Sequence, residues 1–338
     1  MAIQGVGEIL IPQNMSRAGL TTRPGFVLRN RLSGQTMGTE WSVQWCAPKS
    51  ILDEDVQMKL HAVFNRIIKQ MSTWESGSEI SRFNQLPAGS NLEIGPDFQK
   101  VLRDALNLAR ESQGAFDPTY GGLIAERGFG SDVSRINNEK GLHGSDIWES
   151  ITPKKGVVYQ PGGVRLDLSA IAKGYAVDEM TSALHQMGIT QCLTEIGGEF
   201  RGSGAKPDGL PWWVDLEQES LEESYKHRPS NVPIRIALFN LSVATSGAFR
   251  QLKKTETGRI SHIVPAGSVI GTEKNDPDLS CVSVLHKDCL WADGWATALF
   301  ALGLKDGLAL SEDRNLMAVF QRVGGESIYS VAAQSLRL

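Results

Sequence analysis

Cysteine is scarce in this 338-residue sequence, and its four cysteines (Cys46, Cys192, Cys281 and Cys289) are widely separated, with no CxxC pair. This spacing argues against a disulfide framework and against a cysteine zinc site. A chain of this length buries enough surface, roughly 75% of that of the unfolded state, to be stable without such links. We therefore expect reduced, buried thiols.

Long apolar runs and an excess of basic charge are also missing. No stretch of about 18 apolar residues is present, so no helix is expected to span a membrane. The 34 Lys and Arg residues are outnumbered by 38 Asp and Glu residues, which gives a formal net charge of -4. This balance argues against a nucleic-acid-binding protein, whose domain is usually basic. The first residues show neither a basic start nor a sustained apolar core, so we expect a cytoplasmic protein without a secretory signal.

The first 36 residues are biased in charge. They contain Arg17, Arg23, Arg29 and Arg31 but only one acidic residue, Glu8. A targeting segment or a contact with an acidic surface would explain the bias, and so would a loosely attached extension. We predict an N-terminal extension over residues 1–33 and one domain over 34–338.

Hydrophobic periodicity predicts an alternation of helices and strands. Apolar residues recur at helical spacing over 51–71, where Asp53 or Asp55 could cap the helix, and further helices are expected near 97–114, 170–187 and 293–304. Strands are expected within 26–46, 192–202, 234–244 and 279–285, with a hairpin over 157–168. Because the elements lack a regular βαβ order, the sequence predicts an α+β fold of mixed sheets with packed helices.

Asp293 and Thr297 are the first candidate site residues. In ADGWATALFALG they are four positions apart, which places a carboxylate and a hydroxyl on one face of a helix. Both are hard oxygen donors of the kind that Mg²⁺ takes, usually together with substrate phosphates. The alternative is that Asp293 is a helix N-cap and Thr297 is merely packed.

The segment RLDLSAIAKGYAVDEM indicates a second site. Asp167 ends a predicted strand, and a helix follows whose N-terminus could bind phosphate. Small residues, Ala170, Ala172 and Gly174, would allow close approach, and Lys173 adds a cation. An ordinary strand-to-helix turn is the alternative.

Other candidates carry less weight alone. His262, at the end of a predicted strand beside Ser261, could accept a proton, although a structural histidine has the same appearance. Trp74 and Phe116 could stack on a planar ring, or could belong to the core.

Taken together, the sequence resembles the ApbE-like FAD:protein FMN transferase family over about residues 34–303. The resemblance depends on the blocks QTMGTEWSV, MSTWESGSEISRFN, GAFDPTYGGLI, LDLSAIAKGYAVD, LTEIGGEFRG, VATSGAFR, SHIVPAG and ADGWATALFALG. It implies an ApbE-like fold and a Mg²⁺-dependent enzyme with FAD as substrate. Such an enzyme cleaves the FAD pyrophosphate, attaches FMN by a phosphoester bond to a Thr or Ser of an acceptor flavoprotein, and releases AMP.

The resemblance also assigns roles to residues. It implies that FAD is lined by Met37, Trp74, Ala115, Phe116, Asp117, Asp167, Lys173 and Val264. The metal would be held by the main-chain oxygen of Ala170 with Asp293 and Thr297, and His262 would assist the transfer. A Mg²⁺-dependent FAD pyrophosphatase, with water in place of the acceptor, would use the same metal site. A non-catalytic FAD carrier is the other alternative, and it would have no use for a metal at the phosphates.

Overall fold

The computed structural model describes residues 8–12, 15, 26–29, 31–130, 147–218, 233–247, 252–255, 258–265 and 276–338. Its main feature is a nine-stranded sheet in the order β16-β15-β14-β11-β8-β7-β4-β2, with β3 paired to β4 beside β2. Its neighbouring strands are all antiparallel. The strands are β2 (Val27–Leu28), β3 (Leu32–Thr36), β4 (Thr39–Ala47), β7 (Gln191–Ile196), β8 (Glu199–Ser203), β11 (Leu241–Gly247), β14 (Leu279–His286), β15 (Met317–Arg322) and β16 (Ser327–Tyr329).

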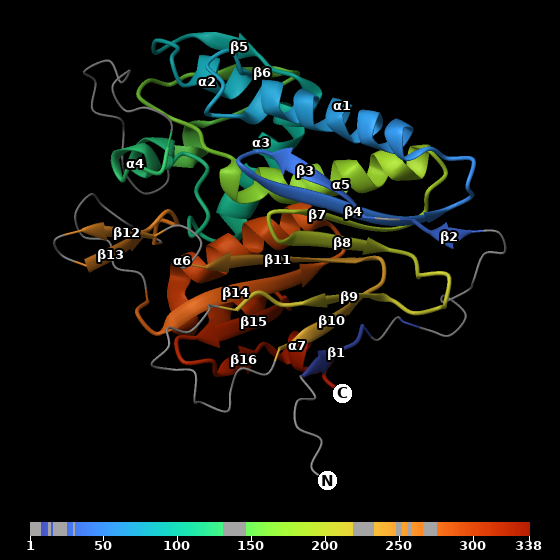
Figure 1. Ribbon diagram of the computed structural model, residues 1–338. Helices are drawn as coiled ribbons and strands as arrows, with labels where there is room; N and C mark the ends of the chain where they lie inside the picture. Colours follow the sequence, from blue (N-terminus) through green and yellow to red (C-terminus); the bar gives the residue numbers. More distant parts are fainter. Residues whose placement is uncertain are drawn as a thin grey trace.

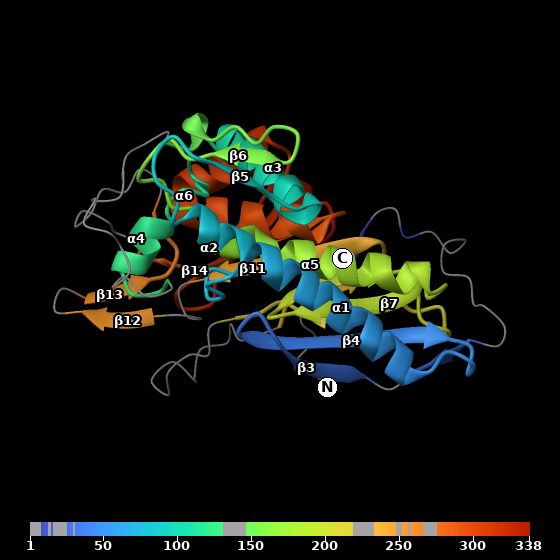
Figure 2. The ribbon, with the colours of Figure 1, turned by 90° about the horizontal axis from the view of Figure 1, so that it is seen from above.

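This sheet separates two hydrophobic cores. Along β15, Ala318 and Phe320 belong to one core and Val319 to the other, as the alternation of side chains along a strand requires. The larger core lies under the helices α1 (Asp53–Met71), α2 (Glu79–Phe83), α3 (Pro96–Glu111), α5 (Ser169–Gln186) and α6 (Cys289–Asp313). Helix α5 lies between α1 and α6 (Figure 2).

The smaller core is covered by a second sheet, in the order β1-β10-β9. It comprises β1 (Ile9–Leu10), β9 (Trp212–Asp215) and β10 (Arg235–Leu238), and α7 (Val331–Gln334) lies beside it (Figure 1). Two short strand pairs complete the described strands: β5 (Asn91–Glu93) with β6 (Val157–Tyr159), and β12 (Leu252–Thr255) with β13 (Gly258–Ser261). The remaining described helices are α4 (Gly121–Glu126) and a short 3₁₀ helix, Ile147–Ser150.

The N-terminal strand β1 ties the two ends of the described chain together. It runs parallel to β10, and Leu10 is fully buried. The amide of Ile11 donates to the Leu336 carbonyl (2.8 Å), and the Glu8 carboxylate contacts the Tyr329 hydroxyl and, at 3.2 Å, the Arg337 guanidinium. Part of the sequence before residue 34 is therefore packed against the fold. The division into an extension and a domain at that residue stays a prediction.

The predicted α+β class is confirmed, and the predicted helices are present with shifted ends. Helix α6 extends over residues 289–313, and the predicted end near 304 coincides with a break at Gly303, whose φ of 78° is not helical. The cap predicted for α1 is wrong: Leu52 is its N-cap, without a side-chain cap. The acidic first turn of α1, which includes Asp53 and Asp55, instead favours the helix dipole.

The predicted hairpin over 157–168 is also wrong. β6 pairs with β5, and no strand follows it up to Asp167. The reason is that side-chain amides form hydrogen bonds with the backbone N–H and C=O groups of this segment, in place of a second strand. Asn84 accepts from the Leu166 amide (2.7 Å) and donates to its carbonyl (2.9 Å), while Gln160 donates to the Val164 carbonyl (3.0 Å).

Within the described residues, no helix combines the length and the apolar character needed to cross a bilayer. The four cysteines are all free and buried, as predicted.

Candidate functional site

A cavity of about 1590 Å³ brings together the twelve residues to which the family resemblance assigned a role. It is larger than the roughly 300–1,000 Å³ of most small-molecule pockets. Its walls are the β3–β4 turn, the end of α1, the loop after α3, the first turns of α5 and α6, the β7–β8 turn, the end of β11 and the segment 262–264. The twelve residues are Met37, Trp74, Ala115, Phe116, Asp117, Asp167, Ala170, Lys173, His262, Val264, Asp293 and Thr297.

The floor of the cavity is the junction of α5 and α6. Asp293 is buried in the second turn of α6, and its Oδ2 accepts from the Gly174 amide of α5 (2.9 Å). In a helix that amide faces the carbonyl four residues earlier, here that of Ala170. The carboxylate of Asp293 and the carbonyl of Ala170 therefore approach the same N–H group. Thr297, one turn further along α6, is within 3.0 Å of the Ser246 hydroxyl of β11.

This geometry excludes the N-cap interpretation of Asp293. The N-cap of α6 is Asp288, five residues earlier, so Asp293 does not cap the helix. The expectation that Gly174 allows a ligand to approach needs correcting too. A Cβ at Gly174 would lie 2.3 Å from the Cys289 carbonyl oxygen, so its small size serves the contact between α5 and α6.

Lys173 brings positive charge to the floor. Its Nζ is 2.8 Å from Oε1 of Glu199, which is fully buried, and 3.7 Å from Oδ1 of Asp293. Two carboxylates and one ammonium leave a formal charge of -1, which suits a bound cation. In the described part of the chain, no three His, Cys, Asp or Glu side chains cluster around a possible metal position. A metal here would therefore depend on one carboxylate, the Thr297 hydroxyl and the Ala170 carbonyl, all hard oxygen donors that fit Mg²⁺.

The start of α5 is connected to the loop after α3. The Asp167 amide donates to the Pro118 carbonyl (2.9 Å), and its carboxylate accepts from the Ser169 amide (2.7 Å). In the loop, Asp117 accepts from the amide (2.7 Å) and hydroxyl (2.6 Å) of Thr119. These turns hold two carboxylates at the cavity wall.

The aromatic candidates differ in exposure. Phe116 is 3% exposed and belongs to the larger core, together with Ala115. Trp74 is 72% exposed at the cavity, so its ring is available to a ligand and is not part of the core. Met37 lies in the two-residue turn between β3 and β4, where it and Gly38 have φ values of 50° and 73°. Such a turn matches the twist of a hairpin and aims the Met37 side chain inward from the strand ends.

His262 directly follows β13, as expected, and is half-buried at the cavity. Its segment is held by α4 and the residues after it. The Arg127 guanidinium donates to the Ile263 carbonyl (3.3 Å), and Val264 packs against Tyr120 and Leu123. Arg127 therefore positions this segment.

Sequence reasoning missed Glu199, the closest partner of Lys173. Its signal was an acidic residue directly after the Gly197–Gly198 turn of TEIGGEF, at the start of a strand. Burial, with the negative charges of Asp178 and Asp293, raises the pKa of the Cys289 thiol well above its ordinary value.

Residues 37–320 match the model of the ApbE family. The chain is 32% identical over 292 residues to an FAD:protein FMN transferase of Vibrio cholerae (83% of this chain, 84% of the relative) and 31% identical over 298 residues to one of Haemophilus influenzae (84% of each).

Solved structures of ApbE proteins are similar to this one. The apo flavinyl transferase ApbE of Pseudomonas stutzeri superposes with a TM-score of 0.77 at 29% identity, covering 92% of this chain and 97% of that one. The flavin transferase ApbE of Vibrio cholerae gives 0.76 at 27% identity, covering 91% and 99%. With most of its length matched by the family model and by these relatives, the chain belongs to the ApbE family.

Proposed function

We propose that this protein is a Mg²⁺-dependent FAD:protein FMN transferase. It cleaves the pyrophosphate of FAD, joins FMN through a phosphoester bond to a Thr or Ser hydroxyl of an acceptor flavoprotein, and releases AMP. The observation that carries this proposal is the convergence, in one cavity, of the hard oxygen donors at the α5–α6 junction with Lys173, His262 and the exposed ring of Trp74.

Asp293, Thr297 and the Ala170 carbonyl would hold Mg²⁺. When bound, the ion neutralises charge on the pyrophosphate oxygens and acts as a Lewis acid. Lys173 adds a second positive charge at the phosphates, and its bond to Glu199 keeps its ammonium group directed into the floor. Trp74 and Met37 offer apolar surface to the flavin or adenine ring.

His262 would accept the proton of the acceptor hydroxyl. The hydroxyl oxygen then forms a bond to the flavin-side phosphorus, the pyrophosphate P–O bond breaks, and AMP leaves with the electron pair. A positioned proton acceptor is worth about 10²–10⁴-fold in rate. A His262→Gln variant should lose transfer by that factor while its KM for FAD is unchanged.

The test mixes the protein with FAD and Mg²⁺, with and without a flavoprotein that bears a candidate Thr. AMP is measured by chromatography and covalent FMN by intact mass. AMP together with an acceptor that gains one FMN supports the proposal. Equal AMP and free FMN with or without several acceptors would indicate a pyrophosphatase instead, and intact bound FAD would indicate a carrier. An Asp293→Ala variant with full Mg²⁺-dependent turnover would contradict the assigned metal site.

A further inference from the structure

Every side chain that β8 directs toward the helices bonds to α5. Glu199 pairs with Lys173 (2.8 Å), Arg201 with Asp178, and the Ser203 hydroxyl with His185 Nε2 (2.9 Å). We call these six residues the polar seam. Successive members on the strand are two positions apart, so all three of its β8 side chains lie on one face. A face that packs against a helix is ordinarily apolar, so the polar seam needs a physical explanation.

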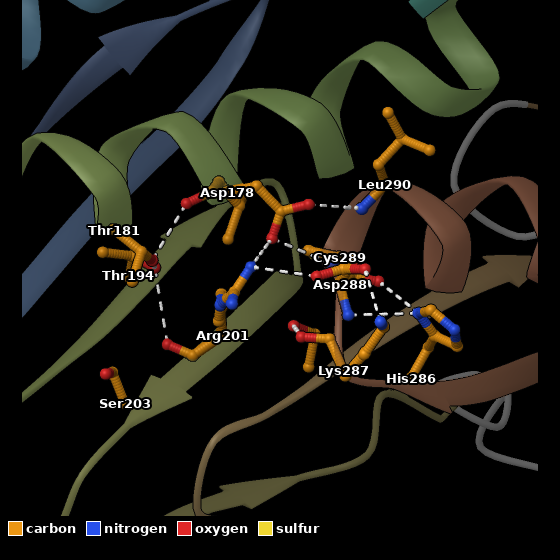
Figure 3. A network of polar contacts seen from close by, with 12 residues as sticks. Asp178, Thr181, Thr194, Arg201, Ser203, His286, Lys287, Asp288, Cys289 and Leu290 are labelled. Atoms are coloured by element: carbon orange, nitrogen blue, oxygen red, sulfur yellow. Dashed lines mark hydrogen bonds and ion pairs between the residues drawn. The ribbon is translucent and has the colours of Figure 1, made fainter. Parts of the chain in front are cut away.

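The middle pair of the polar seam extends to a third element. The Asp178 carboxylate accepts from the amides of Cys289 (2.9 Å) and Leu290 (3.0 Å), the first two residues of α6. Figure 3 shows Asp178 between these amides and the Arg201 guanidinium. The N-cap residue Asp288 makes no side-chain capping bond, so a residue of α5 does the capping. The first amides of a helix need such an acceptor.

This contact fixes α6 along α5 close to the candidate metal ligands. One turn from Asp178, the Gly174 amide donates to Asp293 (2.9 Å). Each helix contributes one amide donor and one carboxylate acceptor, four residues apart: Gly174 and Asp178 on α5, Cys289 and Asp293 on α6. The helices are thus joined at two points about 5–6 Å apart. If the contact between Asp178 and the first amides of α6 is lost, α6 can shift along α5, and Asp293 and Thr297 shift with it.

Stability alone does not explain an ion pair at this place, where the side chains of Asp178 and Arg201 are only 16% and 25% exposed. Desolvation of two ions often cancels their attraction, and well-packed apolar residues of similar size are frequently as stable. Burial raises the pKa of Asp178, and the Arg201 guanidinium and the two amides oppose that rise. Directional hydrogen bonds fix α6 at one defined position along α5, whereas apolar contacts alone do not.

We propose that Asp178 is a positioning residue for the metal site. It holds α6 at the position where Asp293 and Thr297 meet the Ala170 carbonyl, and Arg201 orients its carboxylate. This inference depends on the metal site of the proposed function. Asp178 itself does not line the cavity.

The test compares Asp178→Asn with Asp104→Asn. Asparagine cannot accept from both amides in the same way and loses the charge paired with Arg201. Asp104 is a matched control, because its side chain is similarly shielded (11% exposed, against 16% for Asp178) and ion-paired, with Lys100 at 2.8 Å, but lies outside the α5–α6 contact. Each variant is assayed for the Mg²⁺ concentration that half-saturates AMP release, for Mn²⁺ binding by electron paramagnetic resonance, for FAD binding without metal, and for Tm.

For Asp178→Asn we expect the apparent metal affinity to fall about 10–100-fold, as for other residues that support metal ligands. FAD binding without metal should stay close to that of the unchanged protein. Asp104→Asn should lower Tm and leave the Mg²⁺ dependence unchanged. If Asp178→Asn requires no more Mg²⁺ than the control does, the proposal is wrong.

Failure of the proposed function gives a different result. If the unchanged protein binds Mn²⁺ but does not cleave FAD, the function fails, and the Mn²⁺ affinities of the two variants still decide the role of Asp178. If it binds no Mn²⁺ at all, both proposals are overturned. Should Asp178→Asn not fold, Arg201→Gln serves instead. It leaves the carboxylate at the α6 amides, and a severalfold higher Mg²⁺ requirement supports the proposal, whereas an unchanged one contradicts it.

Discussion

Gly174 offers a direct test of how closely α5 must approach α6. In a Gly174→Ala variant the new Cβ would lie 2.3 Å from the Cys289 carbonyl oxygen and 2.8 Å from the Asp293 Cβ. Ordinary contact begins at 3.4 Å, so the helices must separate by about 1.1 Å. Both obstructing groups are backbone or lie next to it, and neither can rotate away.

The expected loss follows from two opposing effects. Alanine is favoured over glycine inside a helix by about 0.5–1 kcal/mol. Overpacking a close contact costs about 1–3 kcal/mol, which leaves a net loss of about 0–2.5 kcal/mol. A displacement of 1 Å at a reacting centre can cost about 10²-fold in rate. We therefore expect AMP release to fall much more than stability does.

Gly294→Ala is the matched control, because its Cβ would also meet an atom at 2.3 Å. That atom is Cδ2 of Leu108, the end of a flexible side chain, which can turn away. The control should stay within about 1 kcal/mol of the unchanged protein and within a few-fold of its activity. Urea unfolding and steady-state AMP release measure both quantities. Equal behaviour of the two variants, or full activity of Gly174→Ala, would refute the reasoning.

Three further predictions follow from other contacts. In a Glu199→Gln variant, Lys173 loses that carboxylate partner and pairs with Asp293 instead. If this pair is worth about 1 kcal/mol, its competition with Mg²⁺ for Asp293 should raise the half-saturating Mg²⁺ concentration about fivefold. An unchanged Mg²⁺ requirement would show that Lys173 and Mg²⁺ do not compete. Leu10→Ala should cost about 2–5 kcal/mol in urea unfolding, because Leu10 is fully buried, and a cost under 0.5 kcal/mol would show that β1 does not dock. Burial raises the pKa of Cys46 from its ordinary 9.0 to about 11, so the folded state keeps a proton that the unfolded chain loses. The free energy of unfolding should therefore fall as the pH rises from about 9 to about 11. In urea unfolding at a series of pH values, Cys46→Ala should reduce this dependence on pH. An unchanged dependence would contradict the prediction.

The site was more predictable from sequence than the strand pairing was. Spacing alone suggested that Asp293 and Thr297 share a helix face, because helical geometry is local. That Lys173 and His262 belong to the same cavity required the family resemblance, since the contacts that unite them join residues far apart in the chain. The roles assigned to these side chains stay predictions until the assays above are done.

One local error has a clear cause. The hairpin expected over 157–168 assumed that backbone groups bond to near neighbours. Asn84, 82 residues from Leu166, occupies the backbone of the supposed second strand instead. Asp178 is similar: its pattern in AKGYAVD shows an ordinary helical acid, and only the fold places it at the start of α6, 111 residues later. Side chains that serve distant backbone groups leave no periodic signal.

The attachment of β1 has a consequence for synthesis on the ribosome. Ile9 and Leu10 pair with Arg235 and Ile236, and the neighbouring Ile11 bonds to Leu336. During translation, the first strand must wait for partners more than 220 residues away, and the smaller core stays open until the last of them emerge. Until then its apolar side chains are exposed to other chains. We expect this part of the protein to form last, and to be where a chaperone would bind the growing chain.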